Sequence, residues 1–447
     1  MISMISRLFQ KQSSARIIAF GFAAVILIGS GLLMLPCSVR PGVQLNYIDA
    51  LYTSASAVCV TGLVTVDIGT AFTPVGQFFI AMLIQIGGLG VALVGAGIML
   101  AMGKKLDIKG RSLIRDASNL SNGKGTIRFV KSVLLTTLIF EVLGAVLSFI
   151  VFVRDYPIAE ALGHSIFHSI AAFNNSGFDN LGTSGELYSS VSIAAYRNDL
   201  LLNLTTCMLI FFGGIGFLVI RELIEKRFRW KKLSMHAKVV LSFSAVLIAS
   251  GTLLIMLTEH GQLGWTDAFF YSVSARTAGF SIYDLGSFSD AGLLVVMVLM
   301  FIGASPGSTG GGIKTTTFFV LLQGIKSAAT NRSEKAFKYS VPREAFKKAA
   351  VILLISLSVV IVGTYLLVAF EASNQEVGLT DAMLEVVSAF ATVGLSTGIT
   401  PSLGVASKIL SIFIMYVGRL GPLTIATLWY FTKGERAEYP DGNIAIG

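Results

Sequence analysis

Eight apolar stretches, each 19 to 25 residues long, limit the fold of this chain more than any other feature of its sequence. The apolar core of a bilayer is about 30 Å thick, so a helix of about 20 apolar residues crosses it. Two of the stretches contain one charged residue each, Glu141 and Arg419, and the others contain none. The sequence therefore predicts an all-α integral membrane protein with eight transmembrane helices. The stretches are residues 17–35, 78–102, 132–153, 200–220, 239–258, 291–313, 349–370 and 409–432.

The composition agrees with burial in a lipid bilayer. Charged residues make up 13% of the chain, whereas a soluble domain has roughly 25%. So few charges cannot cover a water-facing surface. This excludes a nucleic-acid-binding protein, a disulfide-rich secreted protein and most soluble enzymes.

Lysine and arginine are concentrated in five hydrophilic segments, which hold 27 of the 34 basic residues. Such segments lie in the cytoplasm by the positive-inside rule. We therefore expect a multi-pass protein of the plasma (inner) membrane with both termini cytoplasmic, and an acidic outer side that concentrates cations. The segments are residues 1–16, 104–131, 221–238, 326–348 and 433–436.

A fourfold internal repeat organises the chain. Each external connection holds an apolar stretch of about 12 residues, too short to span but long enough for a re-entrant segment, followed by a glycine. These glycines, Gly62, Gly177, Gly279 and Gly394, recur at intervals of 115, 102 and 115 residues. Each unit contains two spans, so all four units enter the membrane in the same orientation, unlike the halves of inverted-repeat transporters.

The repeat predicts four tandem units of span, re-entrant pore helix and span, in a pseudo-fourfold arrangement around one central pore. The predicted parts are a cytoplasmic N-terminus (1–16), unit 1 (17–110), unit 2 (111–232), unit 3 (233–345), unit 4 (346–433) and a C-terminal tail (434–447).

The four glycine-containing segments are candidates for a cation selectivity filter. Backbone carbonyl oxygens aimed at an axis can replace the hydration shell of a cation, and glycine allows the backbone angles that such a segment needs. Four tight turns that cap helices are the alternative, which the matched positions disfavour. The candidate residues are Cys59, Val60, Thr61, Gly62, Asn174, Asn175, Ser176, Gly177, Arg276, Thr277, Ala278, Gly279, Ala391, Thr392, Val393 and Gly394.

Several motifs occur in register along the chain. They are VTGL (60–63), FNNSGF (173–178), RTAGF (276–280), TVGLSTG (392–398), the glycine-rich segment 303–312 with IKTTT, and GRLGPLT (418–424). Together they resemble the Trk/Ktr/HKT superfamily of potassium uptake proteins, most closely its KtrB-type membrane subunits. The resemblance covers essentially the whole chain. It implies a homodimer in the bilayer, with one pore per subunit and a cytoplasmic ring of nucleotide-binding KtrA-type subunits.

The resemblance also concerns the transported ion. Serine at the first filter position accompanies sodium preference in the plant branch of the superfamily, so Gly62 indicates potassium. The four segments differ in sequence, and we therefore expect weaker selectivity than in a symmetric channel.

The third unit departs from the others at residues 303–312, which are too rich in glycine to hold a stable helix. A kink, or a loop at the membrane edge, is the alternative to an intramembrane loop. The resemblance implies a gate here. The gate residues are Gly303, Ala304, Ser305, Pro306, Gly307, Ser308, Thr309, Gly310, Gly311 and Gly312, with Lys314 and Arg419.

Charged residues within spans are costly and functional by default. Arg419 is expected to line the ion path below the filter, and Lys314 either joins it or extends to the interface. Together they are expected to donate hydrogen bonds to the closed loop. Arg276 is expected to point behind the filter toward an acid such as Glu385, and Glu141 to be paired likewise or packed as a neutral carboxyl.

Neither a metal site nor a nucleotide site is predicted in the chain itself. His164 and His168 have a spacing that suits zinc, but no third ligand is evident, so packing is favoured. Walker and Rossmann motifs are absent from the sequence. Control by ATP, ADP or NAD would therefore come only through a partner subunit.

The sequence thus favours a channel-like potassium permease without a cofactor of its own and without enzymatic activity. A sodium- or proton-coupled potassium symporter is the second hypothesis, with Glu141 as its one midmembrane acid, and a receptor or scaffold is the third. Whether sodium is co-transported or only activates transport stays open, as do the ion affinity and the nucleotide that the partner senses.

Overall fold

The computed structural model describes residues 13–427, except residues 105, 107, 119–124, 183–191, 332–334, 338, 373 and 375–376. Most of the expected N-terminal segment, the end of the eighth apolar stretch (428–432) and the C-terminal tail lie outside the described residues. The described chain is predominantly helical, as expected. Its two strands, β1 (Lys335–Ala336) and β2 (Tyr339–Ser340), form one short antiparallel hairpin.

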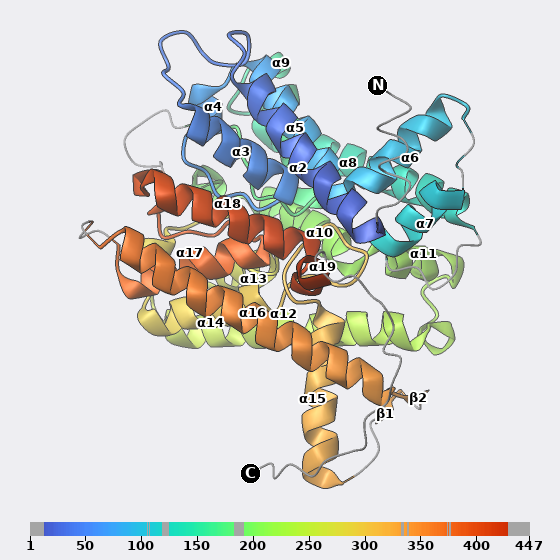
Figure 1. Cartoon of the computed structure of the whole chain (residues 1–447). Helices are drawn as coiled ribbons and strands as arrows, with labels where there is room; N and C mark the ends of the chain where they lie inside the picture. Colours follow the sequence, from blue (N-terminus) through green and yellow to red (C-terminus); the bar gives the residue numbers. More distant parts are fainter. Residues whose placement is uncertain are drawn as a thin grey trace.

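One long apolar helix opens each of the four predicted units (Figure 1). Serine caps fix the start of two of them, because Ser13 accepts a hydrogen bond from the Arg16 N–H and Ser234 accepts one from the Ala237 N–H. All four are long and apolar enough to cross a membrane. They are α2 (Ser14–Leu33), α8 (Thr126–Phe152), α12 (Met235–Thr258) and α16 (Arg343–Phe370).

The second apolar stretch of every unit is broken. The two helices of the first and second units meet at angles of 103° and 97°. Sequence analysis expected such a break in the third unit alone, and continuous helices over 78–102, 200–220 and 409–432 are therefore wrong. The helices are α5 (Pro74–Leu89), α6 (Val91–Ala101), α10 (Leu200–Ile215), α11 (Phe217–Glu225), α14 (Asp290–Phe301), α15 (Thr315–Thr330), α18 (Val405–Leu420) and α19 (Pro422–Thr427).

Single glycines cause three of these breaks. Gly90, Gly216 and Gly421 have φ between 88° and 91° and ψ between 135° and 141°, a region that L side chains rarely adopt. Glycine is frequent in transmembrane helices, so the sequence did not distinguish these glycines from their neighbours. By length and composition, four helices of the described chain can span a bilayer, or six if each bent pair counts as one span.

A short helix follows the first long helix in each unit, where the short apolar stretches were identified. The four have 10 to 16 residues. All end in the interior of the bundle, because residues in their last turns are buried. They are α3 (Tyr47–Cys59), α9 (Ile158–Phe173), α13 (Trp265–Ser274) and α17 (Leu379–Ala391). The remaining helices α4 (Ile68–Ala71) and α7 (Ile108–Ala117) lie in connections.

A repeated contact joins long and short helices. Gly29, Gly144 and Gly251 lie in α2, α8 and α12, and a Cβ on any of them would overlap a serine and a leucine of neighbouring helices. The serine hydroxyls donate to backbone carbonyls three residues before each glycine, at 2.7, 2.6 and 2.8 Å. Small residues permit this close approach of helices. The donors and acceptors are Ser54 and Ile26, Ser169 and Glu141, and Ser272 and Ile248.

Candidate functional site

The four glycine-containing segments lie next to one another in a closed order. A Cβ built on the glycine of each segment would overlap the backbone of the next segment. Gly62 faces the second segment in this way, Gly177 the third and Gly279 the fourth. A Cβ on Gly394 would overlap the backbone of the first segment, which closes the order. We call residues 60–62, 175–177, 277–279 and 392–394 the four-segment ring. Segments more than 300 residues apart in the chain are thereby brought into direct contact.

The backbone has the same unusual conformation in all four segments. The residue two positions before each glycine has a positive φ, between 50° and 77°, although none of these residues is glycine. Such angles cost of order 1–3 kcal/mol each and occur mostly at functional sites. The residues are Val60, Asn175, Thr277 and Thr392.

This conformation turns amide groups away from the ring. The N–H groups of Thr61, Ser176, Ala278 and Val393 donate to carbonyls of the preceding short helix at 2.8 to 2.9 Å. No described residue donates a hydrogen bond to a backbone carbonyl of the ring. Since buried backbone carbonyls normally have partners, these carbonyls are suited to bind a desolvated cation.

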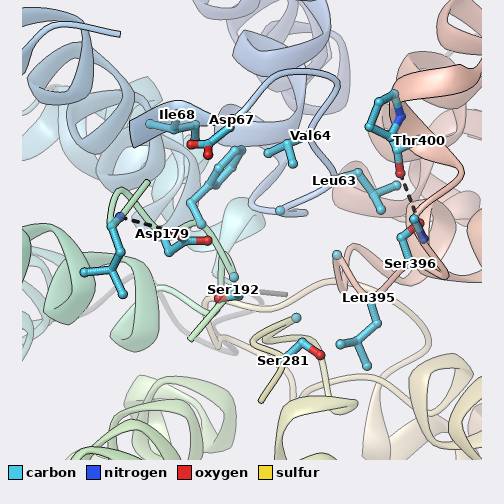
Figure 2. Close-up of a pocket in the computed structure, with 18 of the residues that line it drawn as sticks. Leu63, Val64, Asp67, Ile68, Asp179, Ser192, Ser281, Leu395, Ser396 and Thr400 are labelled. Carbon is cyan, nitrogen blue, oxygen red and sulfur yellow. Dashed lines mark hydrogen bonds between the residues drawn. The ribbon is translucent and has the colours of Figure 1, made fainter. Parts of the chain in front are cut away.

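A cavity of about 600 Å³ opens on one side of the ring and is lined by all four glycines. Leu63, Val64 and Leu395 lie around it (Figure 2). Asp67 and Asp179 also line it. Burial, together with the neighbouring Asp67 carboxylate, raises the pKa of Asp179 to about 7, against the hydrogen bond from the Leu181 N–H. The charge of this cavity therefore depends on pH near neutrality.

The glycine-rich loop (303–312) packs directly against the ring. A Cβ on Gly310 would overlap the Thr277 side chain, and one on Gly311 would overlap the Thr392 side chain. Thr309 Oγ1 donates to the Phe173 carbonyl at 3.2 Å or the Gly213 carbonyl at 3.1 Å. The loop is thus packed in the interior of the described helices, against the ring.

Arg419 and Lys314 hold this loop. The Arg419 guanidinium donates to the Thr309 carbonyl on one side, and on the other to the carbonyls of Gly87 and of Gly88, the latter at 3.0 Å. Lys314 Nζ donates to the Gly310 carbonyl at 2.7 Å. Both expected donors therefore contact the loop, and Lys314 does not extend away from it.

Arg276 lies behind the ring without the expected partner. Its guanidinium donates to the Ser244 carbonyl at 3.4 Å and to Ser244 Oγ at 3.2 Å. Glu385 instead accepts a hydrogen bond from Thr400 Oγ1 at 2.6 Å. Pairing of Arg276 with Glu385 is therefore wrong. Arg276 follows the C-terminal end of α13, where its positive charge is stabilised by the partial negative charge of the helix end.

The histidine pair packs among aromatic rings. His168 Nε2 lies 2.9 Å from Thr206 Oγ1, and its ring makes edge contacts with Phe152 and Phe280. His164 packs against Tyr156. In the part of the chain that the structure describes, no group of three or more His, Cys, Asp or Glu residues could hold a metal ion.

Two ion pairs that sequence analysis missed hold the N-terminal ends of short helices. Lys408 of α18 lies 2.8 Å from Asp49 of α3, and Arg197 lies 2.6 Å from Asp267 of α13. The partners are far apart in the chain, so no local pattern marked them. Another missed contact involves Asn174, Gln85 and Glu141.

Comparisons with known proteins identify the family of this chain and similar proteins. A family model described as the cation transport protein TrkH matches residues 10–434. Ktr system potassium uptake protein B of Bacillus subtilis is 37% identical over 97% of this chain and 96% of that protein. Potassium/sodium uptake protein NtpJ of Enterococcus hirae is 35% identical over the full length of both. The crystal structure of the potassium transporter TrkH from Vibrio parahaemolyticus shares the fold, with a TM-score of 0.71 at 18% identity over 94% of this chain and 86% of that one.

Proposed function

Because the chain belongs to the TrkH family of cation transport proteins, we propose that it is the potassium-selective, channel-like translocating subunit of a potassium uptake system. The protein is a membrane transporter and not an enzyme. The names of its relatives support potassium as the transported ion. The protein would act in the plasma membrane with both termini in the cytoplasm.

The four-segment ring is the observation that carries this proposal. Twelve backbone positions converge there, and no described residue donates a hydrogen bond to their carbonyls. A cation that has lost its water needs such oxygen ligands. The short helices α3, α9, α13 and α17 would act as pore helices, whose C-terminal ends carry partial negative charge toward the ion. Eight spans with pseudo-fourfold symmetry around one pore are part of this proposal.

The glycine-rich loop would be the gate. It packs against the ring through Gly310 and Gly311, and none of its residues lines the cavity on the other side. Arg419 and Lys314 place positive charges next to the loop, where they would repel a cation while the loop is closed. Opening would require these hydrogen bonds to break.

Regulation would come from outside the chain. The Ktr naming of several relatives implies a system of more than one component. We propose a homodimer that docks a cytoplasmic KtrA-type ring on the basic connections, with ATP, ADP or NAD bound by that ring. Sodium would take part in transport only as an activator or as a co-transported ion.

Ion flux in proteoliposomes with imposed gradients tests the function. A channel-like permease moves potassium down its gradient without sodium or protons, and its reversal potential follows the potassium gradient alone. A potassium flux that stops when sodium and proton gradients are removed would establish the symporter hypothesis instead. If no flux appears under any gradient, the transport proposal fails.

A further inference from the structure

The amide of Asn174 is clamped between two helices behind the second segment of the ring. Its Nδ2 group lies 2.8 Å from Gln85 Oε1, 2.9 Å from the Ile170 carbonyl and 3.1 Å from Glu141 Oε1. Asn174 is fully buried. Gly88 closes the site, since a Cβ there would overlap the Asn174 side chain. An amide nitrogen has two hydrogens to donate, so the three acceptors share them, and the amide bridges the end of α9 to α5 and α8.

The other three units have no such clamp. Asn174 lies three residues before the ring glycine, where the other units have Cys59, Arg276 and Ala391. Glu141 lies three residues before Gly144, where the equivalent residues are Ile26, Ile248 and Val360. The contact of the Asn174 amide with the Glu141 carboxyl and the Gln85 amide therefore occurs only behind the second of the four described segments. Glu141 is half-buried in a long apolar helix, where a carboxyl is costly unless it has hydrogen-bond partners, so this departure from the repeat requires an explanation beyond packing.

The last turn of α5 connects the clamp to the gate. Gln85 holds Asn174 from this turn, and the carbonyls of Gly87 and Gly88 in the same turn accept hydrogen bonds from Arg419. Arg419 in turn holds Thr309 of the glycine-rich loop. A continuous set of contacts therefore joins Glu141, the second ring segment, the end of α5 and the loop.

We propose that Glu141 and Gln85 are positioning residues, which fix the second ring segment through Asn174 and couple its geometry to the closed loop. This inference rests on the proposed function of the ring as a potassium filter. Glu141 acts as a hydrogen-bond acceptor behind the ring, since its Oε1 contacts the Asn174 amide, and it does not belong to the residues that line the cavity. When Arg419 leaves Gly87 and Gly88, the end of α5 is released and the clamp loosens.

Two substitutions of Glu141 separate positioning from charge. Glu141→Ala removes the acceptor and is expected to lower the potassium-to-sodium permeability ratio about threefold to tenfold, the range that one hydrogen bond spans. Glu141→Gln keeps an acceptor oxygen and is expected to retain the wild-type ratio within about twofold. The ratio is measured from reversal potentials in proteoliposomes, together with maximal potassium flux, which Glu141→Ala should change less than the ratio.

Val360→Ala is the matched control, because Val360 occupies the equivalent position in the fourth unit and its aliphatic side chain makes no hydrogen bond. It should leave the ratio unchanged. Coupling to the gate predicts that Glu141→Ala has a smaller effect on the ratio in the Arg419→Gln background than alone. Gln85→Leu removes the second acceptor and provides the same test if Glu141→Ala does not yield folded protein.

The clamp is rejected if Glu141→Gln and Glu141→Ala lower the ratio equally, since charge would then be the cause. Equal effects of Glu141→Ala and Val360→Ala would assign the effect to packing. If the wild-type protein conducts potassium with a permeability ratio that Gly62→Ser changes but Glu141→Ala and Gln85→Leu do not, the clamp proposal is wrong and the proposed function stands. Loss of potassium flux in the wild-type protein overturns the proposed function as well.

Discussion

Arg419, in the last turn of α18, donates a hydrogen bond to the backbone carbonyl of Thr309, which lies 110 residues earlier in the glycine-rich loop. The same guanidinium also donates to the carbonyls of Gly87 and Gly88 at the end of α5, so Arg419 connects the loop to the first unit. Hydrogen bonds from a charged donor contribute about 1.5–3 kcal/mol each. A loop held by few such bonds can be released by a modest bias from a partner.

Neutralising Arg419 should open the gate. We expect Arg419→Gln, or a shortening of residues 306–311, to raise maximal potassium uptake by up to about tenfold, because a charged hydrogen bond of this kind is lost. Apparent potassium affinity should change little, since the ring is intact. The measurement is uptake in potassium-deficient cells, with and without the cytoplasmic partner. Arg154→Gln, an exposed arginine paired with Asp199, is the control. Unchanged maximal uptake and unchanged partner dependence would place the gate elsewhere.

Gly62→Ser should weaken potassium discrimination. Gly62 has a φ of 92°, and a side chain there would collide with the Ser176 carbonyl of the ring. Strain of this kind costs about 1–2 kcal/mol, which corresponds to a change of about tenfold in the potassium-to-sodium ratio. Uptake over a range of potassium and sodium concentrations measures the ratio.

Gly261→Ser is the matched control for Gly62→Ser. Gly261 has a φ of 90°, but no atom lies within 4 Å of a Cβ built there. The same backbone penalty then applies without contact with the ring. Equal ratios in the wild-type protein and the Gly62→Ser variant would remove the filter assignment.

Charge reversal on the basic connections should weaken binding of the regulatory ring. Residues 104–115 and 226–238 carry much of the basic charge predicted to lie in the cytoplasm. Glutamate in place of their lysines and arginines should reduce co-purification of a KtrA-type partner, and the loss should be larger at low salt, where charge attraction is less screened. Arg154→Glu, at an exposed arginine outside these connections, is the control. Full association after both reversals would contradict this docking site.

Transport should increase with pH around neutrality. The pKa of Asp179 is raised to about 7 by burial and by the Asp67 carboxylate. Below this pH the carboxyl is neutral, and above it the cavity gains a negative charge that attracts cations. We expect potassium uptake at low external potassium to rise by up to about fivefold between about pH 6 and pH 8.

Asp179→Asn should abolish this pH dependence while leaving uptake at low pH unchanged. Asp290→Asn is the control, because Asp290 is exposed and does not line the cavity. A wild-type pH profile in the Asp179→Asn variant would show that another group titrates.

The sequence by itself determined the membrane class, the helical content and the fourfold repeat. These three features depend on composition and on the spacing of residues along the chain, and both can be read from the sequence alone. The positions of Gly62, Gly177, Gly279 and Gly394 already identified the four segments, and the glycine-rich loop was recognisable because glycine at that density cannot hold a helix.

Only the tertiary structure decided which groups meet. The breaks at Gly90, Gly216 and Gly421 depend on backbone angles that glycine permits but does not require. Arg276 contacts Ser244 rather than Glu385, because Arg276 is buried beside α12 after the end of α13, whereas Glu385 is buried on α17, where it binds Thr400. The contacts from Arg419 to Thr309 and from Asn174 to Glu141 join residues with no shared local pattern, since packing, and not spacing in the chain, brings buried polar groups to their partners.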